Sequence, residues 1–280
     1  SGYLYFDKID DKIKNLEEKL IFVSQIGANN VAEWTEERKN NVYDIAKNEL
    51  IISETKNLLD PKLSEEDLFM AKFALERQLH SSISSYDWLN ELMIIDPNTG
   101  KIIFSTNMII PDINFIEQDH FQKTLLRQIG ISEIFPSQIP IENEYGEYEK
   151  GVPTLLISVP IAGEVGLEGI LTARIDILRM KPGMDDYIED FTTTDAYIVD
   201  SNGYFISKSV FQNELLEKNL IEKRSQLELR VIEPNSNEFT KIFRDIKNAN
   251  IHVDLSGYQN YLGSHVIGSI TPIKNTNWYY

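Results

Sequence analysis

A β-hairpin pattern runs from Met93 to Ser105: Met93-Ile94-Ile95-Asp96-Pro97-Asn98-Thr99-Gly100-Lys101-Ile102-Ile103-Phe104-Ser105. An apolar run is followed by a polar turn and a second apolar run. The chain repeats this pattern with a turn one residue shorter, as Tyr197-Ile198-Val199-Asp200-Ser201-Asn202-Gly203-Tyr204-Phe205-Ile206-Ser207. Asp, Asn and Gly tolerate positive φ and close tight turns, and β-branched or aromatic neighbours suit paired strands. Each copy is therefore predicted to form a hairpin that starts a sheet.

The turn at residues 96–100 has an alternative interpretation, a calcium-binding loop. Such a loop needs oxygen ligands at alternate positions and a bidentate Glu at its end. Gly100 stands where the third oxygen ligand is needed, and Asn107 stands where the Glu is needed. His80, His252 and His265 also lack the spacing of metal ligands. We therefore predict a structural turn, and neither a metal nor a cofactor.

A second landmark indicates that a whole unit recurs. Val159-Pro160-Ile161 and Thr271-Pro272-Ile273 each close an apolar strand, 64 residues after Asp96 and 72 residues after Asp200. Landmarks in the same order at similar separations are typical of an internal repeat. We expect a long N-terminal helix over residues 1–60, a first unit over 61–190 and a second unit over 191–280, whose last strand is cut short.

Apolar residues recur every three or four positions near the N-terminus, as Ile9, Ile13, Leu16, Leu20 and Val23. This spacing predicts a helix with a narrow apolar seam. No proline occurs before Pro61, so one helix, or two helices bent near residues 27–30, is predicted to extend to about Leu59. The seam fits either a dimer contact or packing on the same chain.

The remaining pattern predicts alternating helices and strands. In the first unit we expect helices at 64–79 and 120–129 and strands at 88–95, 101–106, 153–161 and 167–177. In the second unit we expect a helix around 185–190, the hairpin at 196–207, mostly helix over 210–245, a strand at 251–255 and a hairpin at 258–273. The predicted fold class is α+β, with a central antiparallel sheet flanked by helices in each unit.

Composition excludes several classes of function. The net charge of −17 comes from 44 acidic and 27 basic residues, and such a surface repels nucleic acid. Cysteine is absent, so disulfides, thiolate catalysis and Cys-based zinc sites are excluded. No apolar run approaches the ~20 residues that cross a bilayer. The glycine-rich stretch 163–169 leads into a strand and lacks a phosphate-binding Lys, and no catalytic constellation appears. We predict no enzymatic activity.

Several stretches, in this order, resemble those of double Cache (tandem PAS-like) extracytoplasmic sensor domains of histidine kinases and chemoreceptors. They are Val31-Ala32-Glu33-Trp34, the first hairpin, Asp119-His120-Phe121-Gln122, Val159-Pro160-Ile161, Gly169-Ile170-Leu171-Thr172-Ala173-Arg174-Ile175-Asp176 and Asn277-Trp278. The resemblance implies a cell-membrane receptor, with a histidine kinase favoured over a chemoreceptor. It further implies a membrane-distal first unit that binds a small molecule, a membrane-proximal second unit, a homodimer, and transmembrane helices that flank this stretch and are not part of it.

The resemblance also implies a set of site residues. In amino-acid-binding members an Arg precedes an aromatic pair, and an Asp closes the last strand. The pair corresponds to His120-Phe121 and the Asp to Asp176, but Gln118 occupies the Arg position. A neutral amide cannot replace the guanidinium that pairs with a carboxylate. We therefore expect a cationic, neutral or unrelated ligand, or none, rather than an ordinary α-amino acid. The remaining candidates for the binding site are Asp119, Phe135, Ser137 and Tyr145.

Each candidate also has a structural interpretation. Arg174 and Asp176 share one face of their strand and could form an ion pair on the sheet. His120 could line a loop, and Tyr145, in an acidic turn, could lie in solvent. A structural or protein-interaction ectodomain that binds no ligand is therefore the alternative function.

Overall fold

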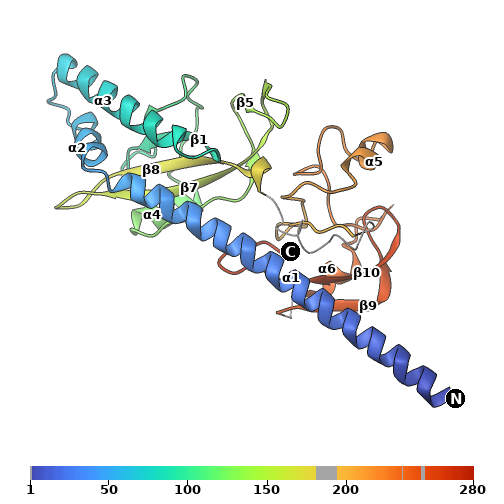
Figure 1. Cartoon of the computed structure of the whole chain (residues 1–280). Coiled ribbons are helices and arrows are strands. Elements are labelled where there is room, and N and C mark those ends of the chain that lie inside the picture. The colour runs from blue at the N-terminus through green and yellow to red at the C-terminus, as the bar shows by residue number, and fades with distance from the viewer. Residues whose placement is uncertain (1, 181–193, 235, 247–249) are drawn as a thin grey trace. The chain divides into compact units, whose positions relative to one another are not determined.

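The computed structural model describes residues 2–180, 194–234, 236–246 and 250–280, with side chains from residue 10 onward (Figure 1). The helix expected around 185–190 lies outside the described residues. The chain forms two compact units. Unit 1 comprises Ser1–Thr35 and Met180–Tyr280 and therefore contains the second unit predicted from the sequence. Unit 2 comprises Glu36–Arg179 and contains most of the predicted first unit.

The N-terminal helix is continuous through Gly27, so the chain does not divide into two helices near residues 27–30. Helix α1 spans Gly2–Ala46, and α2 spans Glu49–Leu58 after a break at Lys47 and Asn48. The side chain of Asn48 accepts a hydrogen bond from the N–H of Leu50 at 3.0 Å and so starts the second helix. Helical structure therefore extends to residue 58, close to the prediction, but the interruption falls at a capping residue.

Gly27 serves packing in unit 1. A Cβ atom at this position would lie 2.1 Å from Cζ of Tyr280, so the tyrosine ring lies directly against the helix backbone. Next to it, Thr271 and Ser24 hydroxyls hydrogen-bond at 2.9 Å, and the Ser269 hydroxyl donates to the Leu20 carbonyl at 3.0 Å. This part of the helix packs on its own chain, whereas Ile13 is 49% exposed.

Unit 2 is built on the first hairpin, which forms as predicted. Strands β1 (Leu89–Ile95) and β2 (Ile102–Ser105) pair antiparallel within a sheet of order β2-β1-β8-β7-β3, and β4 also pairs with β7. The central strands β7 (Pro153–Ala162) and β8 (Leu167–Asp176) follow the predicted ranges closely. Short strands β3 (Gly130–Ile131) and β4 (Phe135–Pro136) pair with β7, β5 (Ile141–Glu142) pairs with β6 (Tyr148–Glu149), and the 3-10 turn η1 (Ile177–Arg179) follows β8.

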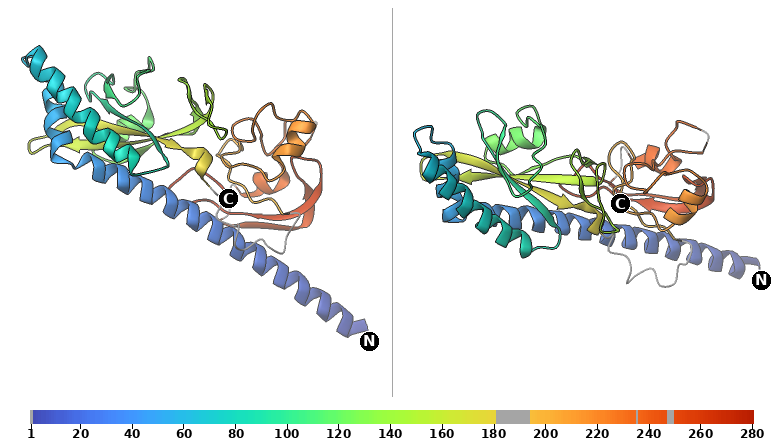
Figure 2. Two further views of the ribbon diagram at one scale, coloured as in Figure 1. Left: turned by 45° about the horizontal axis from the view of Figure 1, so that its top comes forward. Right: turned by 90° about the horizontal axis from the view of Figure 1, so that it is seen from above.

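The two faces of this sheet are covered by different parts of unit 2. Helices α2 and α3 (Glu65–Ser84) cover one face, where Gly169 permits close approach of the Thr55 methyl group. Ser64 caps α3, accepting from the Asp67 N–H at 3.1 Å. Residues 107–129, which we call the cover segment, lie over the other face and include helix α4 (Asp119–Leu125) (Figure 2). Phe115 and Phe121 of the cover segment pack there with buried residues of the strands: Met93, Ile95, Leu156 and Ile170.

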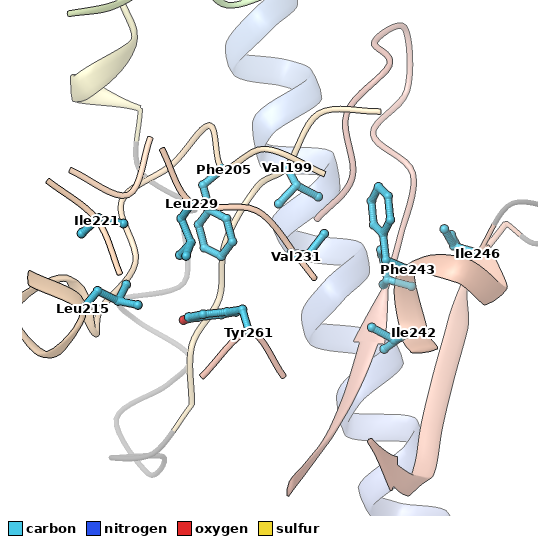
Figure 3. Close-up of a cluster of buried hydrophobic side chains, with 11 residues drawn as sticks. Val199, Phe205, Leu215, Ile221, Leu229, Val231, Ile242, Phe243, Ile246 and Tyr261 are labelled. Atoms are coloured by element: carbon cyan, nitrogen blue, oxygen red, sulfur yellow. The ribbon is translucent and has the colours of Figure 1, made fainter. Parts of the chain in front are cut away.

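Unit 1 contains the second hairpin and a two-stranded sheet. Val199 pairs antiparallel with both Phe205 and Tyr279, and Gly203 takes a φ of +78° in the turn. Strands β9 (His252–Gln259) and β10 (His265–Ile270) form one hairpin. The strand predicted at 251–255 is the start of its first arm, rather than a strand separate from the hairpin predicted at 258–273. Figure 3 shows the apolar core that these segments enclose, in which Val199, Phe205, Leu229 and Tyr261 gather.

The prediction of mostly helix over 210–245 is wrong for the described residues. Only α5 (Gln212–Glu217) and α6 (Lys241–Asp245) are α-helical there. The carboxylate of Glu228 accepts hydrogen bonds from the backbone N–H groups of Glu222 and Lys223, at 2.7 and 3.0 Å. Asn219 and Leu227 have positive φ. Side-chain hydrogen bonds to the backbone replace the helical ones, so the chain loops between the two short helices.

Candidate ligand-binding site

A buried ion pair lies on the sheet face beneath the cover segment. Arg174 of β8 stands opposite Glu91 of β1, and its Nε donates to Glu91 Oε2 at 2.7 Å. The two side chains are 2% and 1% exposed. Ser105 donates to the other Glu91 oxygen at 2.7 Å, and Thr154 accepts from Arg174 Nη1 at 3.4 Å. Charges so far from water persist in proteins only when paired and hydrogen-bonded, and this cluster meets that condition.

A second polar pair connects the sheet to the cover segment. The hydroxyls of Ser158 and Thr172 hydrogen-bond at 2.8 Å across β7 and β8. The Thr124 hydroxyl, on α4, lies 2.8 Å from the His120 carbonyl and 3.2 Å from that of Ser158. Helix α4 is thereby held against the strands, and its buried side is directed at the sheet.

Asp176 lies at the end of β8, on the same face as Arg174, and its carboxylate already has partners. It accepts from the Leu178 N–H and from Arg179 Nε, each at 3.0 Å, and its side chain is 15% exposed. Burial raises the pKa of Asp176, and the hydrogen bond from Arg179 partly opposes this rise. The ion pair of Asp176 with Arg174 that the sequence allowed does not form, because Glu91 stands directly across the strand from Arg174.

His120 and Phe121 are both buried, at 3% and 0% exposure. The ring of His120 meets that of Phe115 edge to face, with centroids 5.9 Å apart. Its Nε2 atom is buried and has no hydrogen-bond partner among the residues that the structure describes. Burial lowers the pKa of His120 to about 4, a shift that nearby Asp119 partly opposes. His120 is therefore a neutral imidazole at pH 7 with an unused hydrogen-bonding atom.

The other predicted site residues lie in different surroundings. Phe135 is half-buried and packs on the cluster that contains Phe121. Gln118 is half-buried at the start of α4, where its side chain makes no capping hydrogen bond. The hydroxyl of buried Ser137 accepts from the Val152 N–H at 3.2 Å and so belongs to the pairing of two backbone segments. Asp119 is exposed.

Tyr145 lies at the tip of the β5–β6 turn and is 70% exposed. The structure thus brings His120, Phe121 and Phe135 together, and places Asp176 at one end of the same sheet face. Tyr145 and Asp119 face solvent. For Tyr145 this agrees with the structural interpretation, in which the acidic turn lies in solvent.

Glu91, its hydrogen-bond partner Ser105, and Thr154, which hydrogen-bonds Arg174, were not among the candidate residues identified from the sequence. A signal for the pair was present, because Glu91 interrupts a strand that is otherwise nearly apolar, Leu89-Asn90-Glu91-Leu92-Met93-Ile94-Ile95. An acid in a buried strand requires a buried cation, and Arg174 is the basic residue of strand β8.

The described residues contain no metal-binding cluster: no group of three or more His, Cys, Asp or Glu side chains among them is placed to hold a metal ion. Within the same residues, none of the helices combines the length and the apolar character that a membrane span requires.

Solved structures of sensor domains share this fold. The ligand-binding domain of the Pseudomonas aeruginosa PAO1 amino acid chemoreceptor PctC, in complex with GABA, matches with a TM-score of 0.54 at 14% identity, over 94% of this chain and 97% of that chain. The extracellular domain of the putative histidine kinase rpHK1S-Z16 matches with a TM-score of 0.54 at 11% identity, over 95% of this chain and 92% of that chain. The ligand-binding domain of P. aeruginosa PctB, in complex with L-Arg, matches with a TM-score of 0.52 at 15% identity, over 95% of this chain and 86% of that chain.

At these identities the likeness concerns the fold alone. A search of curated protein sequences finds no match. The family model for the Cache domain, dCache_1, matches residues 9–280. Because that match covers nearly the whole chain, the protein belongs to the Cache domain family, as a double Cache sensor domain.

Proposed function

We propose that this chain is the extracytoplasmic sensor domain of a transmembrane signalling receptor, with a sensor histidine kinase favoured. In this proposal unit 2 is the membrane-distal unit and binds a small molecule between its sheet and the cover segment. The solved structures named above support it, since they are described as a histidine kinase extracellular domain and as chemoreceptor domains in complex with GABA and L-Arg. Flanking transmembrane helices would attach the domain to the membrane.

The unpartnered Nε2 of His120 is the observation that carries the binding site. A buried polar atom without a partner costs about 1–3 kcal/mol, and such atoms in folded proteins call for a functional explanation. A ligand that hydrogen-bonds to Nε2 would remove this cost. The atom belongs to the helix that Thr124 holds against the sheet, so a bound ligand would contact both layers.

Signalling requires that the ligand bind two conformations of the receptor with different affinity. Contacts to His120 and Phe115 come from the cover segment, whereas Arg174 and Asp176 come from the sheet. A ligand between them would favour one packing of cover segment on sheet. We propose that this change reaches a dimer of receptor chains, for which the exposed Ile13 on the α1 seam offers an apolar contact.

The proposal is tested by thermal unfolding of the whole chain in the presence of individual small metabolites. A ligand of unit 2 should raise the midpoint for the wild type and much less for His120→Leu and Asp176→Asn. Asp119→Asn is the matched control, because it alters an exposed carboxylate on the same helix. If no compound stabilises the domain, and both variants keep full signalling in the full-length receptor, unit 2 is not the ligand sensor.

Exposed apolar side chains favour a second function, a protein-interaction module. Met108, Ile109 and Ile110 are consecutive in the cover segment and are 97%, 52% and 53% exposed, and contiguous apolar surface marks contact sites. Replacing all three with Ser separates the two functions. If this variant loses signalling while ligand-induced stabilisation is unchanged, and the His120 variant signals normally, the interaction function holds instead.

A further inference from the structure

We propose that the ligand of unit 2 is uncharged at the end that meets His120: a neutral amide or heterocycle that shares one hydrogen bond with Nε2 and packs its apolar body against the neighbouring phenylalanine rings. This inference rests on the proposed function and narrows it to one chemical class. Three observations lead to it.

The first observation is that the charged groups on this face of the sheet are already matched. Arg174 is paired with Glu91 at 2.7 Å, and Asp176 with Arg179 at 3.0 Å. A ligand carboxylate would have to take Arg174 from Glu91 and leave that acid buried without a partner. Removing one member of a buried pair is strongly unfavourable, so an anionic group gains little here. A ligand ammonium group at Asp176 would compete with Arg179, whose Nε already donates to that carboxylate at 3.0 Å.

The second observation is the surroundings of His120. Asp119 and Lys123, its charged neighbours on α4, are exposed and act in opposite directions on the imidazole. Burial outweighs both and holds the ring neutral, so this location disfavours a positive charge of any kind. A cationic ligand group beside Nε2 would pay the same desolvation cost. An anionic group would pull a proton onto the ring, whereas a neutral donor or acceptor would leave its protonation unchanged.

The third observation is the aromatic cluster next to the His120 ring. Phe115 meets His120 edge to face, and Phe121 lies with its centroid 6.3 Å from that of Phe115. Phe135 packs on the same cluster while remaining half-buried. Ring edges and faces of this kind suit a flat apolar body through offset or edge contacts. A buried imidazole with an unused nitrogen, beside an apolar aromatic cluster, is complementary to a ligand with one hydrogen-bonding end and an apolar ring.

A matched triplet and a matched pair of probes test this inference on the whole chain. Benzamide, benzoate and benzamidine have nearly the same shape but are neutral, anionic and cationic, and nicotinamide and nicotinate form a second neutral–anionic set. We expect calorimetric titration to show a neutral amide binding at least about tenfold more tightly than its charged counterparts, a difference of about 1.4 kcal/mol. Its affinity should stay constant between about pH 5.5 and 8, because no proton is taken up.

Variants of His120 connect the binding to this atom. His120→Leu removes the hydrogen-bonding group and should weaken the neutral amide about tenfold or more, whereas His120→Asn keeps a polar group and should restore part of the affinity. Asp119→Asn should bind as the wild type does. The pH profile of the wild type stays decisive if the Leu variant fails to fold.

The outcomes separate this inference from the proposed function. A charged probe that binds more tightly than its neutral counterpart, or an affinity that rises steadily as the pH falls, would overturn the uncharged ligand while unit 2 remains a sensor. The same holds if no neutral probe binds at millimolar concentration while an amino acid or amine stabilises the domain. Failure of every compound, together with normal signalling by the His120 variants, would overturn both.

Discussion

Removing either member of the Glu91–Arg174 pair should destabilise unit 2 strongly, and removing both should not. Glu91→Gln leaves a guanidinium that is 2% exposed without its carboxylate, and Arg cannot release its proton. We expect a loss of about 3–5 kcal/mol in the free energy of unfolding. With a urea m-value of roughly 2 kcal/mol per M, the midpoint would fall by about 2 M.

The opposite single variant, Arg174→Met, leaves the buried Glu91 carboxylate without its cation and should cost a similar free energy of unfolding. The double variant Glu91→Leu with Arg174→Met should come within about 1 kcal/mol of the wild type, since apolar replacements of buried pairs are often neutral.

The chain offers its own reporter for this measurement. Of the three tryptophans, Trp88 is buried in unit 2, whereas Trp34 and Trp278 belong to unit 1. Urea unfolding followed by fluorescence in a Trp34→Phe, Trp278→Phe background therefore reports on unit 2.

The exposed Lys47–Asp44 pair in the same unit, at 2.8 Å, supplies the matched control. Asp44→Asn should leave the midpoint unchanged, because solvent screens that pair. If Glu91→Gln costs less than about 1 kcal/mol, or if the double variant is no more stable than the single variants, the pair is not the buried, mutually dependent unit described here.

Three further predictions follow from single residues. The folded-state pKa of His120 is lowered to about 4 from 6.5, so the unfolded chain binds a proton first as the pH falls. The free energy of unfolding of unit 2 should therefore decrease by up to about 3 kcal/mol between pH 6.5 and pH 4. Comparing the wild type with His120→Asn by urea unfolding isolates this loss, and identical pH profiles would contradict it. Burial raises the pKa of Asp176, so its ionised carboxylate lowers the free energy of unfolding at pH 7. Asp176→Asn should therefore unfold at the same or a higher urea concentration than the wild type. A clearly lower midpoint would show that the hydrogen bond to Arg179 stabilises unit 2 by more than the desolvation of Asp176 costs. In unit 1, a Cβ at position 27 would lie 2.1 Å from the Tyr280 ring, so Gly27→Ala should cost about 1–3 kcal/mol, measured by Trp278 fluorescence; an unchanged midpoint would mean that the ring moves aside freely.

Local patterns in the sequence predicted the elements that depend on neighbouring residues. The turn residues of both hairpins, and Ser64 at the start of α3, lie within a few positions of the structures that they specify. The same reasoning did not locate the break at Lys47 and Asn48. Asn48 is a good capping residue, but it occurs within a helical pattern that offered no proline or glycine to mark an end.

The prediction of helix over 210–245 did not succeed because a charged segment rich in helix-forming residues can satisfy its backbone in another way. Glu228 accepts hydrogen bonds from the N–H groups of residues 222 and 223. Propensity describes the average free energy of a residue in a helix, and these specific hydrogen bonds within unit 1 outweigh it.

The sequence by itself determined where the two hairpins lie and which face of β8 carries Asp176. Only the tertiary structure decided that Arg174 pairs with Glu91, 83 residues away, and that His120 is buried with Nε2 unpartnered. Strand alternation and turn chemistry act over a few residues and can be read locally. The charge state and hydrogen bonding of a side chain depend on what excludes water from it, and folding brings those groups from distant parts of the chain.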